Sequence, residues 1–327
     1  MTVKKLAELS GTSIGTVSKA FSGSREISEK TREKIFALAK EHGCFDKFYK
    51  DPRTRPLIAL LYPEPESEYY SREIGILERA LNDRGADVII SFTRFDPEQE
   101  ARLFRELAYG MKVDGIILSG SGELIRNSDE LPFIIISHDG KATQNGDVVR
   151  IETDEGIRAL VETVKKYGHR NVGYIGEKLA SVKEIKFRQA MRAAGLPVYE
   201  EYIYISGERF AMAGEDGMRA FIELGNLPTV IITAYDQIAY GAMRYARACG
   251  YRIPDDISFV GMDDVSTTPY LYTPLSPVHI NLEDVCSQVT ELVFKRIENR
   301  HYRSRAEITV PMTVKIRESL KDIASKN

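Results

Sequence analysis

Apolar and polar residues alternate at helical spacing over the first 40 residues. Val3, Leu6 and Leu9 are three positions apart, which predicts that they share one face of a short helix. Gly11 ends that helix with a tight turn, and the Ser13 hydroxyl is placed to cap a second one. The second helix is expected to bury Val17, Ala20 and Phe21, and a third helix, capped by Ser28, to pack on both through Ile35, Leu38 and Ala39.

The outer face of the second helix is small, polar and cationic. It carries Ile14, Gly15, Thr16, Ser18, Lys19 and Ser22. Two helices joined by a glycine turn, with such a face on the second, are typical of a protein that reads the DNA major groove. The alternative is an ordinary helical hairpin that binds no ligand.

From Leu57 the pattern changes to apolar runs of strand length that alternate with amphipathic helices. This alternation predicts parallel sheets covered by helices on both faces, hence an α/β body. The pattern repeats after a crossing near residues 151–154, which indicates two similar halves. A late helix and a final pair of strands are expected to return and complete both halves.

These patterns predict three parts. Residues 1–46 form a helix-turn-helix headpiece, residues 47–57 a short linker or hinge, and residues 58–320 the body. The first lobe of the body should comprise about 58–151 with 279–305, and the second about 152–278 with 306–320. Pro52 and Pro56 cannot lie inside a helix, so the linker is expected to be extended.

Composition narrows the classes of function. The 327 residues carry a net charge of −3, but residues 1–55 hold 12 Lys/Arg against 7 Asp/Glu, and the remainder is acidic. A basic N-terminal part on an acidic body is expected if the N-terminal part contacts the phosphate backbone of a nucleic acid and the body does not. We expect no membrane segment and a cytoplasmic protein with no metal or cofactor. The three cysteines share no metal spacing, and no nucleophile elbow, phosphate-binding loop or dinucleotide motif occurs, so an enzyme is not expected.

Residues 2–35 resemble the DNA-binding headpiece of the lactose-repressor (LacI/GalR) family of bacterial transcription regulators. The pattern runs through Thr2, Val3, Leu6, Ala7, Gly11, Ser13, Thr16, Val17, Ser18, Ser28, Thr31, Arg32 and Ile35. The resemblance implies that Ile14, Gly15 and Lys19 read base edges, and that Thr2, Ser13, Thr16, Ser18 and Ser22 hold phosphates. Gly15 has no side chain, so sequence readout should depend on Lys19, Ile14 and DNA shape.

The linker departs from that family. Its members usually have a longer segment here, in which a hinge helix forms on DNA and a leucine enters the minor groove. This chain has no leucine between residues 46 and 56. Phe48 or Tyr49 could be the wedge instead. Alternatively, these two side chains pack on the headpiece or only tether it.

The body also resembles the family, through residues 113–117, 167–170, 254–264 and 273–278. The resemblance implies the two-lobed fold of periplasmic sugar-binding proteins, with ligand in the cleft at the carboxyl ends of the strands. Asp263 ends a predicted strand, and its carboxylate can accept hydrogen bonds from sugar hydroxyls. The other effector-binding candidates are Tyr69, Tyr70, Ser137, Lys183, Phe210 and Tyr235. The alternative for the aromatic residues among them is a place in the core.

The function expected from these observations is a ligand-responsive regulator, most simply a repressor of carbohydrate-metabolism genes. It would bind a pseudo-palindromic operator in double-stranded DNA as a homodimer, with a sugar or sugar derivative as effector. The alternative hypothesis is a cytoplasmic sugar-binding protein whose headpiece no longer binds an operator.

Overall fold

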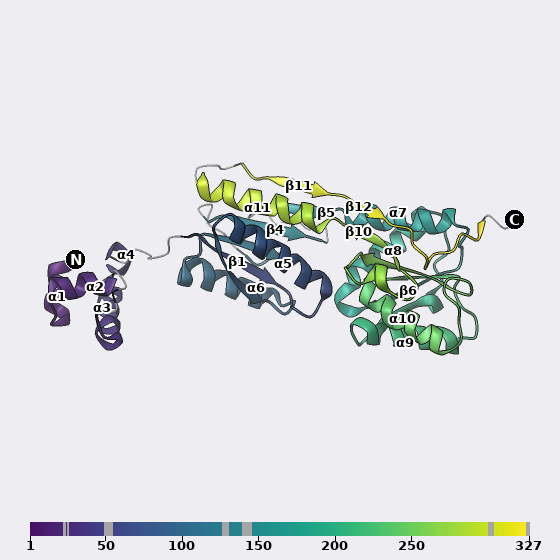
Figure 1. The fold of residues 1–327 in the computed structure, drawn as a ribbon, viewed down its shortest axis with the longest axis horizontal. Helices are drawn as coiled ribbons and strands as arrows, with labels where there is room; N and C mark the ends of the chain where they lie inside the picture. The colour runs from purple at the N-terminus through teal and green to yellow at the C-terminus, as the bar shows by residue number, and fades with distance from the viewer. Residues whose placement is uncertain are drawn as a thin grey trace. The chain divides into compact units, whose positions relative to one another are not determined.

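The computed structural model describes residues 1–21, 24, 26–48, 55–125, 131–138, 146–299 and 304–324. The chain divides into two compact units, Met1–Pro56 and Leu57–Asn327. The first unit contains α1 (Val3–Ser10), α2 (Ile14–Phe21), α3 (Glu29–Glu41) and the short α4 (Phe45–Phe48) (Figure 1).

The headpiece helices begin at side-chain caps, of which those at Ser13 and Ser28 were predicted and the one at Thr2 was not. The backbone N–H of Lys5 donates to Thr2 Oγ1 over 3.2 Å, and Thr16 N donates to Ser13 Oγ over 3.0 Å. Gly11 adopts the left-handed conformation, with φ of 68°, that ends α1. The helices enclose a small core of Leu6, Ala7, Val17, Ala20, Phe21, Ile35, Ala39 and Cys44.

The prediction that Leu9 shares one face of α1 with Val3 and Leu6 is wrong. Leu9 is 42% exposed, whereas Ala7 and Ser10 are buried. Each step of three residues falls about 60° short of a full helical turn, so Leu9 rotates away from the face that starts at Val3. Residues at spacings of three and four therefore form the buried face.

The body consists of two lobes, each built on a six-stranded sheet. The first sheet has the order β11-β5-β4-β3-β1-β2 and the second β12-β10-β9-β8-β6-β7. All neighbouring strands are parallel except β10 and β12. The strands are β1 (Leu57–Tyr62), β2 (Asp87–Phe92), β3 (Gly115–Ser119), β4 (Phe133–Ser137), β5 (Asp147–Ile151), β6 (Val172–Glu177), β7 (Ile203–Ser206), β8 (Val230–Thr233), β9 (Ser258–Asp263), β10 (Ser276–Ile280), β11 (Glu307–Val310) and β12 (Met312–Val314).

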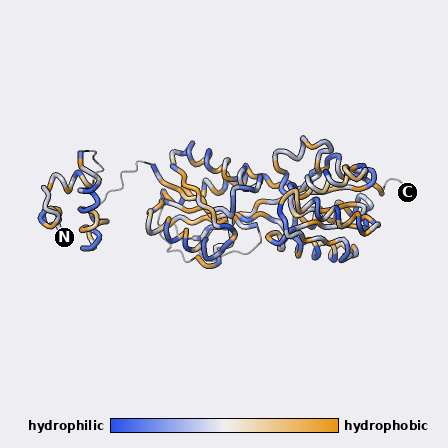
Figure 2. The backbone as a smooth tube through the Cα atoms, turned by 90° about the horizontal axis from the view of Figure 1, so that it is seen from below, coloured by the Kyte–Doolittle hydropathy of each residue, from blue (hydrophilic) through white to orange (hydrophobic). Residues whose placement is uncertain are grey.

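Helices cover both faces of the sheets, as the alternating pattern predicts. Ile58 and Leu60 of β1 share a core with α5, whereas Ala59 and Leu61 share a separate core with α6. Figure 2 shows the apolar positions concentrated along the strands of both lobes. The helices are α5 (Glu68–Asp83), α6 (Pro97–Arg105), α7 (Thr153–Lys166), α8 (Ser181–Ala193), α9 (Phe210–Glu223), α10 (Asp236–Ala248) and α11 (Leu282–Glu298). Among the described residues, none of the helices combines the length and the apolar character needed to cross a membrane.

The chain passes between the lobes three times. The first crossing is at Glu152, between β5 and α7. The second is at Asn281, because β10 lies wholly in the second sheet and pairs with β9, and not at the predicted residues 278/279. The third is at Pro311, because β11 pairs with β5 of the first sheet and β12 with β10 of the second. The predicted assignment of 306–320 to the second lobe is therefore wrong for β11.

Candidate functional site

The residues predicted to contact DNA lie on α2 and at the caps of α1 and α2. Ile14 is 53% exposed, and Gly15, Ser18 and Lys19 are also exposed, so this part of α2 presents an outer face to solvent. Thr2 and Ser13 cap their helices, and Thr16 Oγ1 lies 2.9 Å from Ser13 Oγ. Ser22 lies outside the described residues.

Lys19 forms an ion pair that the sequence did not indicate. Its ammonium group contacts the Glu26 carboxylate, and this hydrogen bond lowers the pKa of Glu26 below its usual value. Both side chains are more than half exposed, so water and salt weaken the pair. Lys19 can therefore exchange Glu26 for a phosphate or a base edge at little cost.

Phe48 packs on the headpiece. Its ring centroid lies 5.8 Å from that of Phe21, and the Phe45 and Phe21 centroids are also 5.8 Å apart. Of the two hypotheses for Phe48, this contact corresponds to packing on the headpiece. The headpiece therefore extends beyond the predicted boundary at residue 46. Tyr49 lies outside the described residues.

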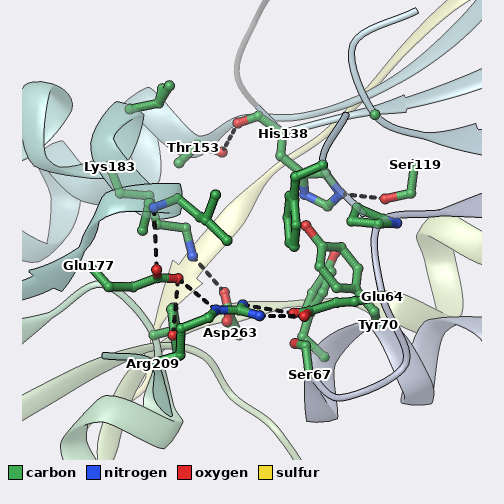
Figure 3. Close-up of a pocket in the computed structure, with 18 of the residues that line it drawn as sticks. Glu64, Ser67, Tyr70, Ser119, His138, Thr153, Glu177, Lys183, Arg209 and Asp263 are labelled. Carbon is green, nitrogen blue, oxygen red and sulfur yellow. Dashed lines mark hydrogen bonds and ion pairs between the residues drawn. The ribbon is translucent and has the colours of Figure 1, made fainter. Parts of the chain in front are cut away.

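A cavity of about 280 Å³ lies between the two lobes of the body. Six of the seven predicted effector-binding residues line it: Tyr69, Tyr70, Lys183, Phe210, Tyr235 and Asp263. They come from strand ends or from the starts of the helices that follow, where a doubly covered parallel sheet is open to ligand (Figure 3).

The seventh residue, Ser137, does not line the cavity. It is fully buried at the last position of β4, and its neighbour His138 faces the cleft instead. Successive residues of a strand point to opposite sides, so a shift of one position exchanges the buried and the cleft-facing side chain. The prediction at Ser137 is therefore wrong by one residue.

Asp263 and Lys183 are partners inside the cleft. Lys183 Nζ donates to Asp263 Oδ1 over 3.1 Å and to the Ala234 carbonyl over 2.9 Å. Asp263 adopts a left-handed backbone with φ of 101°. A non-glycine residue pays for that conformation with strain, which is common where a side chain must face a ligand. The end of β9 therefore places the Asp263 carboxylate in the cleft, with its Oδ1 already accepting a hydrogen bond from Lys183.

Tyr235 links two elements of the second lobe. Its hydroxyl donates to Glu177 Oε1 over 3.2 Å and accepts from the Phe210 backbone N–H over 3.2 Å. Burial raises the pKa of this phenol above its usual value. Tyr235 therefore holds the backbone of Phe210 in place at the start of α9.

Arg209 was not predicted, although it precedes Phe210. Its guanidinium contacts the Glu64 carboxylate through both terminal nitrogens, with 2.7 Å between Nη2 and Oε1, and its Nε lies 3.4 Å from Glu177 Oε1. It also lies over the rings of Phe95 and Phe210. Figure 3 shows Arg209 between Glu177 and Glu64. The available sequence signal was a charged residue, Glu64, two positions after the end of β1.

A neutral imidazole faces the cleft from the first lobe. Burial, and next the nearby Lys183 charge, lower the pKa of His138 to about 3. Its Nε2 lies 3.4 Å from the Ser119 hydroxyl, and its ring meets the Tyr69 ring edge to face. His138 and Ser119 together offer uncharged hydrogen-bonding groups.

Glu73 lies behind this wall of the cleft and is fully buried. It accepts a hydrogen bond from the Tyr69 hydroxyl over 3.2 Å. Burial raises its pKa to about 7, against the opposing effect of the tyrosine hydroxyl groups. The carboxyl group is therefore coupled to the cleft through Tyr69.

The arrangement suits a small polyhydroxylated ligand. Carboxylates accept hydrogen bonds from hydroxyl pairs, and the aromatic rings offer faces to apolar C–H groups. The cavity volume is close to the lower end of about 300–1,000 Å³ for small-molecule sites.

Comparisons with known proteins match the two parts of the chain separately. Residues 2–44 match the family described as bacterial regulatory proteins, lacI family, and residues 161–320 match the periplasmic binding protein-like domain. The chain is similar to the HTH-type transcriptional regulator DegA of Bacillus subtilis (29% identity over 293 residues, 85% of this chain and 86% of DegA). It is also similar to the HTH-type transcriptional repressor PurR of Mannheimia succiniciproducens (24% identity over 337 residues, 99% of each chain).

Solved structures of the same architecture cover nearly the whole chain. The transcriptional regulator CelR in complex with cellobiose has a TM-score of 0.68 at 25% identity, and it covers 98% of this chain and 100% of its own. The lac repressor dimer bound to operator has a TM-score of 0.70 at 20% identity, with 98% and 99% covered. The chain belongs to the lacI family of bacterial regulatory proteins, whose members are DNA-binding transcriptional regulators and not enzymes.

Proposed function

We propose that this regulator represses carbohydrate-metabolism genes in the cytoplasm and responds to a sugar bound between the lobes of its body. The observation that carries the proposal is the cleft itself, where Asp263, Glu177 and Glu64 meet the rings of Phe210 and Tyr70. The relative PurR is named a repressor, and the structural neighbour CelR holds cellobiose. Both support the proposal.

The DNA-binding form is a homodimer on a pseudo-palindromic operator. One headpiece presents a single recognition helix, α2, and so reads one half-site, whereas two-fold symmetry supplies the second. Tyr270 and Tyr272, on the loop after β9, are 88% and 90% exposed. Aromatic side chains exposed to this extent are suited to contact a second copy of the chain.

Effector binding changes operator affinity only through a difference in affinity for two arrangements of the lobes. The cleft contacts both lobes, so a ligand in it favours one arrangement. That arrangement is proposed to set how well the twin headpieces fit their half-sites.

A gel-shift assay of the full chain on its own upstream DNA tests this function, with cellobiose, sucrose and monosaccharides added in turn. We expect retardation at low salt that one sugar relieves or strengthens. A protein that retards no DNA but binds a sugar in calorimetry would instead be the sugar-binding protein of the second hypothesis.

A further inference from the structure

The ion pair between Glu64 and Arg209 joins the two lobes of the body. Glu64 follows β1 of the first sheet, and Arg209 precedes α9 of the second lobe. The contact is bidentate, the geometry in which arginine binds a carboxylate most strongly. The Glu64 side chain is 5% exposed and that of Arg209 29%, so water screens the pair poorly.

The second lobe holds Arg209 ready for this contact. Glu177 accepts from Arg209 Nε over 3.4 Å, and the guanidinium carbon lies 4.4 Å from the centroid of the Phe210 ring. These partners belong to the same lobe as Arg209, so they orient the guanidinium whether or not the lobes meet. Glu64, together with the Phe95 ring whose centroid lies 5.4 Å from the guanidinium carbon, supplies the part of the interaction that depends on the first lobe.

Other contacts between the lobes are weaker by comparison. Glu68 accepts hydrogen bonds from Ser266 and Thr267, with 2.9 Å between Thr267 Oγ1 and Glu68 Oε2, but this group is exposed. Hydrogen bonds from neutral hydroxyls to an exposed carboxylate contribute less than a bidentate pair of opposite charges in a desolvated cleft.

We propose that Glu64 and Arg209 form a latch that holds the two lobes together across the cleft in the ligand-free protein. The assignment rests on the proposed function, because both residues line the proposed effector site. Removal of the Glu64 charge leaves Arg209 paired with Glu177 in its own lobe. The lobes then lose their strongest electrostatic tie, and the ligand-free body samples wider separations.

Glu64→Gln is the direct variant, because it keeps the side-chain shape and removes the charge. Glu66→Gln is the matched control, two residues away on the same loop. Glu66 pairs with Arg94 over 3.2 Å, and both residues belong to the first lobe and are more than half exposed. Loss of that pair removes one charge and breaks no hydrogen bond between the lobes, because Glu66 acts on Arg209 only through a minor Coulomb attraction.

The readout is the distance between two spin labels, measured by pulsed electron paramagnetic resonance on the full chain without ligand. One label attaches to Cys249, which is exposed in the second lobe, whereas Cys44 and Cys286 are buried. The other attaches to a cysteine introduced by Glu98→Cys, at an exposed position of α6 in the first lobe. Dilution with unlabelled protein isolates the distance within one chain of a dimer.

We expect Glu64→Gln to shift the distance distribution to longer and broader values, while Glu66→Gln matches the wild type. If the Glu64→Gln distribution coincides with those of the wild type and Glu66→Gln, the latch proposal is wrong. If Glu64→Gln fails to fold by circular dichroism, Glu64→Asp replaces it, since it retains the charge but shortens the reach. Glu64→Asp is also expected to widen the distribution, and an unchanged one counts against the proposal.

The measurement needs neither DNA nor sugar. If the gel-shift assay shows no operator binding or no sugar response, the proposed function fails while the distances still decide the latch. If the distances do not change but a sugar relieves retardation, the function stands and the latch is wrong.

Discussion

Lys183 donates a hydrogen bond to Asp263 over 3.1 Å, so the cation and the anion predicted for effector binding are each other's partners in the cleft. The pair crosses from the start of α8 to the end of β9, within the second lobe. A sugar hydroxyl that binds Asp263 therefore meets a carboxylate already oriented by Lys183. This orientation lowers the entropic cost of binding.

Asp263→Asn should shift the sugar response to higher sugar concentrations and leave operator binding intact. Asparagine tolerates the left-handed backbone that Asp263 adopts, so lost charge is the main change. The loss of one charged hydrogen bond should weaken binding by about 1.5–3 kcal/mol. Calorimetry with the responding sugar measures this change. Asp255→Asn, at an exposed position of the same lobe, serves as control and should bind normally.

Lys19→Ala should weaken specific operator binding by about 1–3 kcal/mol and leave sugar affinity unchanged. Lys19 stands on the exposed face of α2, and its partner Glu26 is also exposed, so the fold does not depend on the pair. Gel-shift titrations on operator and on unrelated DNA measure the loss. Equal weakening on both DNAs would show that Lys19 contacts phosphates only. Lys166→Ala on α7 controls for the change in net charge.

Glu73→Gln should change how stability depends on pH. Burial raises the pKa of Glu73 to about 7 from 4.5, so the folded state binds this proton more tightly than the unfolded state. The contribution of this proton to the free energy of unfolding is fully present below pH 4.5 and is lost as the pH rises through 7. Relative to the variant, the wild type should lose roughly 3 kcal/mol over that range.

Urea unfolding of both proteins from pH 5 to 8 tests the effect of Glu73. His138 titrates with the opposite sign, because its pKa is lowered to about 3, but it is common to both proteins and cancels in the difference. A difference in stability that does not change with pH would show that Glu73 is ionised throughout.

Phe48→Ala should destabilise the headpiece in the absence of DNA. The Phe48 ring contacts Phe21, but it is only half-buried, so the loss should fall below the about 3–5 kcal/mol typical of a fully buried phenylalanine. Hydrogen exchange of the α2 amides measures the change. Unaltered protection together with reduced DNA bending would identify Phe48 as a minor-groove wedge instead.

Local sequence pattern was sufficient for the headpiece and for the order of elements in the body. The caps at Thr2, Ser13 and Ser28, and the turn at Gly11, act within a few residues of themselves. Strand-length apolar runs likewise predicted both sheets, because a strand buried on two faces leaves a continuous apolar signal. The predictions for Leu9 and Ser137 were wrong about the direction in which the side chain points. Leu9 is rotated around α1 away from the buried face, and Ser137 is one position along the chain from the residue that faces the cleft.

By itself, the sequence determined the helix-turn-helix head, the two-lobed α/β body and six of the residues that line the cleft. The tertiary structure decided that β11 and β12 belong to different sheets, that Phe48 packs on the headpiece and that Arg209 meets Glu64. Glu64 and Arg209 are 145 positions apart in the chain. Such contacts depend on how distant strand ends come together in space, and no local periodicity carries that information.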